Sequence, residues 1–320
     1  MKQIWNDIHG QFHPFSALDF LPRDKMRALQ TQRLKEIVAL SYAKVPLYRA
    51  RMDEKGVKPS DINSIDDISK LPFMQKTDLR DTYPDGLFAV EKKEIVRLHA
   101  SSGTTGKPIV VAYTDEDLRV WDSSIIRCLK MYGVTSSDIV QNCYGYGLFT
   151  GGMGLHSGSQ ALGCTVIPAS GGNTERQLML MKDLGTTVFA STPSYFMHLV
   201  EEGKKRGIDF KKLPLRIGGG IHILEDNFYP EIVDPETGEV MPDGEEGELV
   251  LSTLTKRAMP VLRYRTHDIT SIIAEPCSCG RTIRRIARIS KRSDDMLIIR
   301  GVNVFPSQIE IGIGRVEEAT

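Results

Sequence analysis

The chain has 320 residues, of which 41% are hydrophobic and 26% charged, and 41 basic side chains (Lys and Arg) balance 41 acidic ones. This composition is typical of a globular protein, and the length allows a large core that needs neither disulfides nor a metal. The zero net charge disfavours nucleic acid and anionic membranes as main partners. No stretch has the length and apolarity of a bilayer span, and the N-terminus lacks the apolar core of a signal peptide. We therefore expect a cytoplasmic protein.

The first third of the chain has the pattern of packing elements. Apolar residues at helical spacing predict an amphipathic helix over residues 23–48. Residues 64–67 (Ser-Ile-Asp-Asp) look like a capping box that opens a short helix, which Leu-Pro-Phe at 71–73 stops. Two strands, 96–100 and 109–113, flank a Ser/Thr/Gly loop, and a charged helix follows over 115–132.

The middle of the chain predicts an α/β architecture. Residues 139–174 carry no charge and hold nine glycines between Gly145 and Gly172, which favours buried strands and tight turns around a cavity. Short apolar runs at 187–190 and 215–218, with a helical pattern at 194–206 between them, indicate parallel strands. From residue 226 onward, turn residues alternate with apolar runs, so we expect β-rich structure there.

The loop at 101–108 carries the first chemical signal. Hydroxyls, backbone amides exposed by glycines and one lysine suit a nucleotide triphosphate tail, although a Ser/Thr-rich hairpin turn is the alternative. A Walker loop is disfavoured because Pro108 stands where the magnesium-binding Ser/Thr would be. The remaining loop residues are Ser101, Ser102, Gly103, Thr104, Thr105, Gly106 and Lys107.

Three further patterns are weaker when each is taken alone. Asp268 ends the run Arg263–Asp268, where a carboxylate past a strand end could bind ribose, but an exposed charged turn is favoured. The basic run at 281–292 suits a solvated face first and a phosphate-rich ligand second. Tyr144 and Phe149 could be core aromatics, but the glycines beside them favour a flat apolar pocket.

The five cysteines are an odd number and divide into two groups. Cys128, Cys143 and Cys164 lie singly in apolar surroundings, so we expect reduced core residues. Cys277 and Cys279 form a short Cys-x-Cys turn before a glycine, which suits a tetrahedral metal site, although two surface thiols are the serious alternative.

As a set, in this order, these motifs give the chain a specific resemblance. It resembles the adenylate-forming superfamily and, within it, the phenylacetate–coenzyme A ligases, from the N-terminus to about residue 310. The matching segments are 101–108, 144–152, 247–255, 263–268 and 292–310.

The resemblance implies an AMP-forming acid–thiol ligase that joins an aryl-acetic acid, phenylacetate first, to coenzyme A with ATP and Mg²⁺. It implies a large α/β domain at 1–291 with a β-rich portion, a hinge and truncated small domain at 292–320, and a homodimer. A non-catalytic nucleotide- or acid-binding remnant is the alternative.

The resemblance also implies roles for individual residues. Thr104, Thr105 and Lys107 would act on the phosphates, with Ser101, Ser102, Gly103 and Gly106 completing the loop. Asp268 would hold the ribose, Arg292 the ribose or α-phosphate, and Asp294 the hinge pivot. The aryl pocket would be formed by Tyr144, Phe149, Gly151 and Gly152.

Two departures from the family pattern stand out. Several dozen residues, with the adenine loop and a magnesium-binding Glu, are missing near 218–221, and most of the small domain with its lysine is missing after the hinge. Either the protein has decayed or segments are omitted from this sequence; the intact motifs favour omission, which predicts long Cα steps near both places. His267 stands at a usual Gly, which we expect a surface position to tolerate.

The resemblance raises the odds of a metal site. Relatives often carry a cysteine-containing stretch just before the position of His222, within the absent segment. We therefore expect His222, Cys277 and Cys279 to hold a structural zinc ion, with a fourth thiolate from that stretch.

Overall fold

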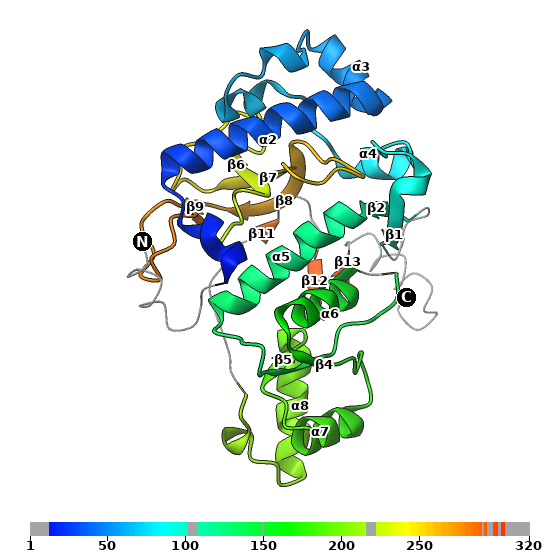
Figure 1. Cartoon of the computed structure of the whole chain (residues 1–320), viewed down its shortest axis with the longest axis vertical. Helices are drawn as coiled ribbons and strands as arrows, with labels where there is room; N and C mark the ends of the chain where they lie inside the picture. Colours follow the sequence, from blue (N-terminus) through cyan, green and yellow to red (C-terminus); the bar gives the residue numbers. More distant parts are fainter. Residues whose placement is uncertain are drawn as a thin grey trace, which may run out of the picture.

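Two sheets of different construction organise the molecule. The computed structural model describes residues 13–101, 108–148, 150–215, 222–289, 291–292, 297–299 and 302–304. A four-stranded sheet of order β11-β8-β7-β6 is antiparallel, and a three-stranded sheet of order β4-β3-β5 is parallel. The two sheets lie in different parts of an elongated molecule, with α2 and α3 at one end and α7 and α8 at the other (Figure 1). The predicted α/β class is confirmed.

The N-terminal helices form the cover of the antiparallel sheet. The predicted helix at 23–48 is wrong in extent, because two helices occupy that region, α2 (Arg23–Lys44) and α3 (Pro46–Glu54). Val45 is extended at φ −110° and ψ 108°, since a residue before proline avoids the helical region, and Pro46 then opens the next helix. Short 3₁₀ turns precede and follow them, η1 (Pro14–Phe20), η2 (Pro59–Asp61) and η3 (Ile65–Lys70). The predicted capping box is confirmed at η3, where the amide of Ser64 donates to Asp67 at 2.8 Å.

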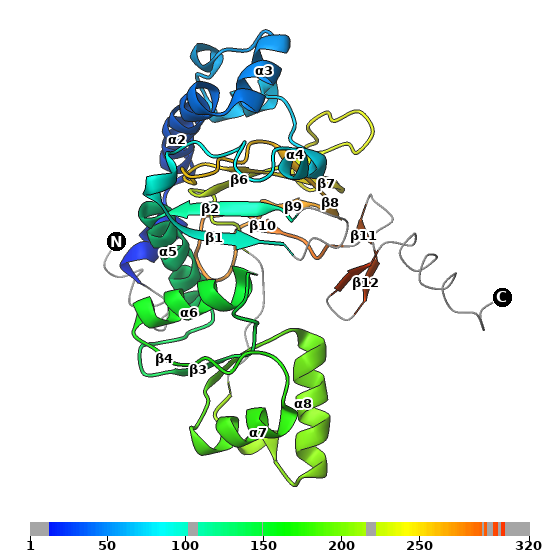
Figure 2. The same cartoon turned by 90° about the vertical axis from the view of Figure 1, so that its right-hand side faces the viewer.

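The antiparallel sheet confirms the β-rich region expected after residue 226. It contains β6 (Phe228–Val233), β7 (Gly247–Thr253), β8 (Tyr264–Thr270) and β11 (Lys291–Arg292). The N-terminal helices lie over this sheet (Figure 2), and the main core is formed by buried side chains from these helices and from the loop between β7 and β8, among them Leu34, Ile37, Val38, Leu254, Met259 and Leu262. A ribbon of β9 (Ile272–Ile273) and β10 (Arg285–Ile286) extends beside it.

The parallel sheet has helices on both faces. Its strands are β3 (Ile139–Asn142), β4 (Thr165–Ile167) and β5 (Val188–Ala190). Side chains of α5 (Asp115–Met131) and α6 (Thr150–Leu162) pack on one face, and those of α7 (Thr174–Asp183) and α8 (Pro193–Lys205) on the other. The predicted strand at 187–190 and helix at 194–206 are confirmed; of the strand predicted at 215–218, Leu215 belongs to no strand and the rest lies outside the described residues.

The glycine-rich stretch differs from its prediction. Four of its glycines lie in α6, a helix, where strands and turns were expected. A Cβ on Gly154 would lie 2.2 Å from the ring of Trp121, and one on Gly158 would lie 2.4 Å from Ile125. These two glycines are one turn apart on α6, and the side chains they face are one turn apart on α5. The glycines therefore permit close packing of two helices, a requirement that a linear sequence does not display.

A hairpin joins the two halves of the fold. It contains β1 (Ile95–Ala100) and β2 (Val110–Thr114), as predicted, and α5 starts directly after it with a capping box between Thr114 and Asp117. The remaining short elements are α4 (Lys76–Asp81), η4 (Lys92–Glu94), η5 (Phe210–Lys212), β12 (Leu297–Ile299) and β13 (Val302–Val304). Among the helices in the described part of the chain, none combines the length and apolarity needed to cross a bilayer.

Candidate functional site

The root of the proposed nucleotide loop is held by Ser101. Its amide donates to the carbonyl of Ile109, and its Oγ accepts from the amide of Ile109, both at 3.0 Å. These bonds close the hairpin just where β1 ends and before β2 begins. The loop residues Ser102, Gly103, Thr104, Thr105, Gly106 and Lys107 lie outside the described residues.

The strand leading into this loop is bonded to the predicted aryl-pocket segment. The carbonyl of Leu148 accepts from the amide of Ala100 at 3.0 Å and lies 3.0 Å from Nδ1 of His99. Because a carbonyl only accepts, Nδ1 of His99 carries the proton in this contact. His99 is 3% exposed, and among the residues that the structure describes its buried Nε2 has no hydrogen-bond partner. One buried histidine thus connects the two predicted substrate regions.

A cleft of about 870 Å³ opens at the carboxyl ends of the three parallel strands. This edge is where ligands bind in open α/β sheets, because the loops after neighbouring strands converge there. Its walls come from the turn after β3, the turn after β4 and the start of α8, and comprise Cys143, Tyr144, Gly145, Gly171, Gly172, Ser191, Thr192, Ser194, Tyr195, Met197, His198 and Glu201. The cleft is the candidate site for the organic substrate.

Tyr144 is the predicted pocket residue that the structure places on this cleft. Its backbone amide donates to Oδ1 of Asn142 at 3.1 Å and its hydroxyl donates to the carbonyl of Ser191 at 3.0 Å, so both the backbone and the tip of the side chain are anchored. Burial raises the pKa of the Tyr144 hydroxyl, which keeps it protonated. The ring is therefore fixed as part of the cleft wall.

Gly151 and Gly152 lie in the first turn of α6, beside the cleft. A Cβ on Gly152 would lie 2.3 Å from the carbonyl oxygen of Gly145, so this glycine lets α6 approach the turn that carries Tyr144. Phe149, predicted with them, lies outside the described residues.

Most of the cleft wall was missed by sequence reasoning. Gly171 and Gly172 lie in the stretch expected to surround a cavity but were not named as wall residues, and Ser191, Thr192, Tyr195 and His198 come from a segment that was assigned no role. A usable signal was present, because Ser-Gly-Gly follows β4 and Ser-Thr-Pro-Ser follows β5. Small polar residues directly after parallel strands mark the edge where sites form.

Asp268 and Arg292, the two residues predicted for the ribose region, are in contact. Arg292 Nη1 donates to Asp268 Oδ1 at 2.6 Å, and the two are paired across β11 and β8. Asp268 lies within β8 and not past a strand end as expected, because residues 264–270 themselves form the strand. The hinge residue Asp294 lies outside the described residues.

The segment before Asp268 is also more buried than expected. Arg263 is 2% exposed and pairs with the buried Glu231 through Nη2 at 2.9 Å, so the favoured interpretation as an exposed charged turn was wrong. His267 has φ +63°, a left-handed conformation that side chains disfavour, which gives a backbone reason for the glycine usual in the superfamily. Its amide donates to Oε1 of Glu248 at 3.0 Å, and this buried contact holds the unusual turn.

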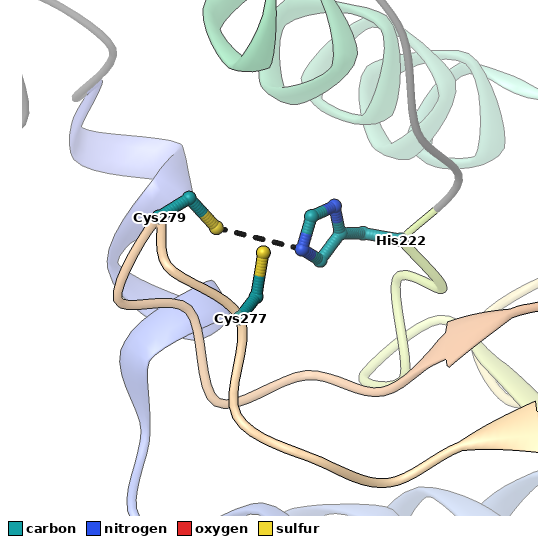
Figure 3. A group of neighbouring side chains, drawn as sticks. All are labelled: His222, Cys277 and Cys279. Atoms are coloured by element: carbon teal, nitrogen blue, oxygen red, sulfur yellow. Dashed lines mark hydrogen bonds between the residues drawn. The ribbon is translucent and has the colours of Figure 1, made fainter.

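The predicted metal ligands His222, Cys277 and Cys279 point toward one another (Figure 3). Nε2 of His222 lies 3.5 Å from Sγ of Cys279, and the three ligand atoms lie within 4.8 Å of one another. A backbone bridge to Arg285 positions the histidine, and the amide of Gly280, at φ +77°, donates to the carbonyl of Cys277 at 3.0 Å to close the turn. These contacts join two segments more than fifty residues apart.

The surroundings of His222 and Cys277 favour the basic forms of these two side chains. Burial first, and then the charges of Arg281 and Arg285, lower the pKa of His222 to about 4. A hydrogen bond from the backbone of Cys279 lowers the pKa of Cys277. Neutral imidazole and thiolate are the forms that these side chains present to a cation.

The other three cysteines are free, as expected, but differ in position. Cys143 and Cys164 are buried, as predicted for core residues, whereas Cys128 is exposed. Its neighbours Arg127 and Leu129 are buried on α5, and the surface position of Cys128 follows from the helical turn between them.

Comparison with known proteins places this geometry in a family. The chain is 48% identical to the phenylacetate–coenzyme A ligase of Thermus thermophilus over 338 residues, covering 92% of this chain and 76% of the relative. The corresponding ligase of Aromatoleum evansii is 45% identical, over 90% of this chain and 75% of the relative. The chain belongs to the phenylacetate–coenzyme A ligase family. No protein-family model matches the chain.

A solved structure confirms the adenylate-forming ligase fold. The match is to 2-hydroxyisobutyryl-coenzyme A ligase in complex with its acyl-AMP and coenzyme A, with a TM-score of 0.84. Sequence identity to it is 24%, and the match covers 93% of this chain and 74% of that chain. The fold therefore extends over nearly all of the present chain.

The alignment to the Thermus ligase is longer than the part of this chain that it covers. The alignment extends over 338 residues, whereas 92% of the 320 residues here is about 294, a difference of about 44. The absence of several dozen residues near 218–221 stays a prediction. Residues 216–221, where a long Cα step is predicted, lie outside the described residues, as do residues 305–320.

Proposed function

We propose that the protein is an AMP-forming acid–thiol ligase that joins an aryl-acetic acid, phenylacetate first, to coenzyme A at the expense of ATP. The single observation that carries this proposal is the 48% identity to a phenylacetate–coenzyme A ligase over 92% of the chain. The geometry supports it, because a cleft with an anchored tyrosine lies beside the root of the nucleotide loop.

The cleft would take the aryl acid. The ring would pack against Tyr144, where burial of apolar area and ring stacking stabilise the complex. Thr192 caps α8 at the cleft wall, so the first amides of a 13-residue helix lie near the substrate and favour an anionic group there. Phe149, Gly151 and Gly152 complete the proposed pocket.

The hairpin loop and the second sheet would take ATP. Thr104, Thr105 and Lys107 would bind the phosphates together with the loop amides, and Asp268 would accept hydrogen bonds from the ribose hydroxyls. Arg292 would share its guanidinium between Asp268 and the ribose or α-phosphate. Mg²⁺ would enter with the ATP phosphates, as is usual for this cation.

The chemistry then has two steps. A carboxylate oxygen of the acid attacks the α-phosphorus of ATP, the bond to the bridging oxygen breaks, and pyrophosphate leaves. The thiol of coenzyme A then loses its proton and attacks the acyl carbon, so that the thioester forms and AMP leaves. Between the steps, residues 292–320 would move relative to the domain at 1–291 about Asp294. A homodimer in the cytoplasm completes the proposal.

Acid-dependent ATP–pyrophosphate exchange by the full-length protein tests this function. We expect exchange with phenylacetate, and comparison with 4-hydroxyphenylacetate, indoleacetate and benzoate ranks the acids. Tyr144→Ala should raise the KM for the acid by about tenfold or more, because one buried aromatic contact is lost, and leave the KM for ATP unchanged. Asp268→Asn should raise the KM for ATP and leave the KM for the acid unchanged. Absence of any acid-dependent exchange would indicate the non-catalytic remnant.

We further propose that His222, Cys277 and Cys279 hold a structural zinc ion with a fourth thiolate from the absent segment. The fit is geometric: nitrogen and sulfur ligands of a tetrahedral zinc ion lie about 3.5 Å apart, given bonds of about 2.0 and 2.3 Å, and the His222–Cys279 separation is 3.5 Å. When bound, the ion would tie the turn at 277–280 to the segment around His222.

Metal analysis of the full-length protein tests the zinc proposal. We expect about one zinc per chain and its loss in Cys279→Ser, whereas Cys128→Ser, which alters an exposed cysteine outside the cluster, should retain it. Retention of zinc by Cys279→Ser would refute this ligand set.

A further inference from the structure

A second, smaller pocket lies apart from the cleft, with no lining residue in common. Its volume is about 200 Å³, and β2, α5 and the segments at the start of β6 and the end of β7 form its walls. Its lining residues are Tyr113, Asp117, Val120, Trp121, Ser124, Asn227, Phe228, Thr253, Thr255 and Lys256. Three aromatic rings and one ammonium group therefore face the same small space.

In the part of the chain that the structure describes, Lys256 is a cation without a paired carboxylate. Its Nζ donates to the carbonyl of Ala112 at 2.7 Å and lies 3.5 Å from the centre of the Tyr113 ring. Within the described residues, no carboxylate oxygen lies within the 4.0 Å of an ion pair with it. A cation removed from water without a counterion is destabilised, and an anion that reached it would relieve this.

The nearby carboxylate of Asp117 has other partners. Its Oδ1 accepts from the amide of Arg257 at 2.6 Å, and its Oδ2 accepts from the amides of Thr114 and Ala258 at 2.9 and 3.0 Å. Three backbone amides thus hold Asp117 in place as a cap of α5. The position beside the ammonium group of Lys256 stays open to an anion from outside the chain.

We propose that this pocket is a second binding site for a small aromatic carboxylate, with the carboxylate at Lys256 and the ring among Tyr113, Trp121 and Phe228. The size supports this class, since cavities of about 150 Å³ accept benzene, whereas drug-sized ligands need about 300 Å³ or more. The choice of an aryl acid as the probe rests on the proposed function. Lys256 donates a hydrogen bond to the backbone of β2, and β2 follows the nucleotide loop. A ligand bound in the pocket would therefore affect this strand.

The site has an expected pH dependence. Burial lowers the pKa of Lys256 to about 8, and Asp117 and Tyr113 are the other titratable groups that line the pocket. A bound carboxylate favours the charged ammonium, so affinity should be constant below that pKa and fall as the pH rises through about 8 and above. The acid itself stays ionised over this range.

Tryptophan fluorescence reports on this pocket directly. The chain has two tryptophans, Trp5 and Trp121, so in a Trp5→Phe background of the full-length protein the signal comes from a residue that lines the pocket. Titration with phenylacetate and with benzoate should give a saturable change. Lys256→Met should weaken binding about tenfold or more, as expected for loss of a charged hydrogen bond, and phenylacetamide, the uncharged isostere, should bind both proteins equally weakly.

The outcomes separate this site from the proposed reaction. Equal phenylacetate affinity of Lys256→Met and its parent, or no saturable Trp121 signal, would overturn the proposal. If Lys256→Met does not fold, the pH dependence of phenylacetate binding to the parent protein tests the proposal. An affinity that does not change between pH 7 and pH 10 would overturn it. ATP–pyrophosphate exchange measured on the same samples tests the proposed function independently. A protein without exchange activity could still show the saturable change in Trp121 fluorescence.

Discussion

Replacement of Asp19 by asparagine should strongly destabilise the fold. Asp19 is fully buried in η1, and its carboxylate accepts from Nε of Arg127 at 2.9 Å and from Nε of Arg281 at 3.2 Å. Both guanidiniums are buried as well, with 1% of each side chain exposed. Asp226 lies 2.7 Å from the same Arg127 and also pairs with Arg33 at 3.1 Å, so the network joins two carboxylates to three guanidiniums.

The magnitude follows from the charge left behind. Removal of one partner from a buried ion pair costs about 3–5 kcal/mol, because the other charge stays desolvated. Asp19→Asn keeps the shape and removes the negative charge that faces Arg127 and Arg281, while Arg127 retains Asp226. We therefore expect the lower end of that range, about 3 kcal/mol, which for a chain of this length lowers Tm by about 4–5 °C.

Urea unfolding followed by circular dichroism measures this loss, and a surface pair provides the matched control. Asp66→Asn removes a carboxylate that pairs with Arg27 while both side chains are well exposed, so its effect should stay below about 1 kcal/mol. A loss below 1 kcal/mol for Asp19→Asn, or equal losses for the two variants, would refute the reasoning that burial sets the magnitude.

Three further predictions concern packing, positioning and pH. Gly154→Ala should lower the free energy of unfolding by about 1–3 kcal/mol, because its Cβ would overlap a tryptophan ring, whereas Gly147→Ala, whose Cβ meets nothing within 4 Å, should change it little in the same urea assay. His99→Asn, which keeps a donor near Nδ1, should retain the KM for the aryl acid in the exchange assay, whereas His99→Leu should raise it; equal values would contradict the positioning role. Burial alone would raise the pKa of Glu225, but two arginines hold this pKa below its ordinary value. The ionised Glu225 therefore stabilises the fold above about pH 4.5, and this stabilisation is lost at lower pH. Glu225→Gln should reduce the difference in unfolding free energy between pH 6 and pH 3, and an unchanged difference would contradict this role of Glu225.

The sequence alone was sufficient for features that depend on neighbouring residues. The capping box at Ser64, the strand–loop–strand hairpin around 101–108 and the helix at 115–132 depend on local spacing. The family and its fold followed from motifs read in order along the chain. The cluster of His222, Cys277 and Cys279 was expected through the resemblance, because residues more than fifty positions apart give no local sign of contact.

Tertiary structure decided whatever depends on which segments meet. Gly154 belongs to the stretch in which strands and tight turns around a cavity were expected, yet it lies in a helix, where the close contact with Trp121 outweighs the low helix propensity of glycine. Arginine is usually a surface residue, yet Arg263 is buried, because Glu231 of β6 compensates its charge. The cleft draws Tyr144, Gly172 and Thr192 from the ends of three parallel strands, and the pocket of Lys256 draws on four separate elements. The free energy of packing depends on contacts between residues that are far apart in the chain. A single sequence does not show which of these residues will be neighbours in space.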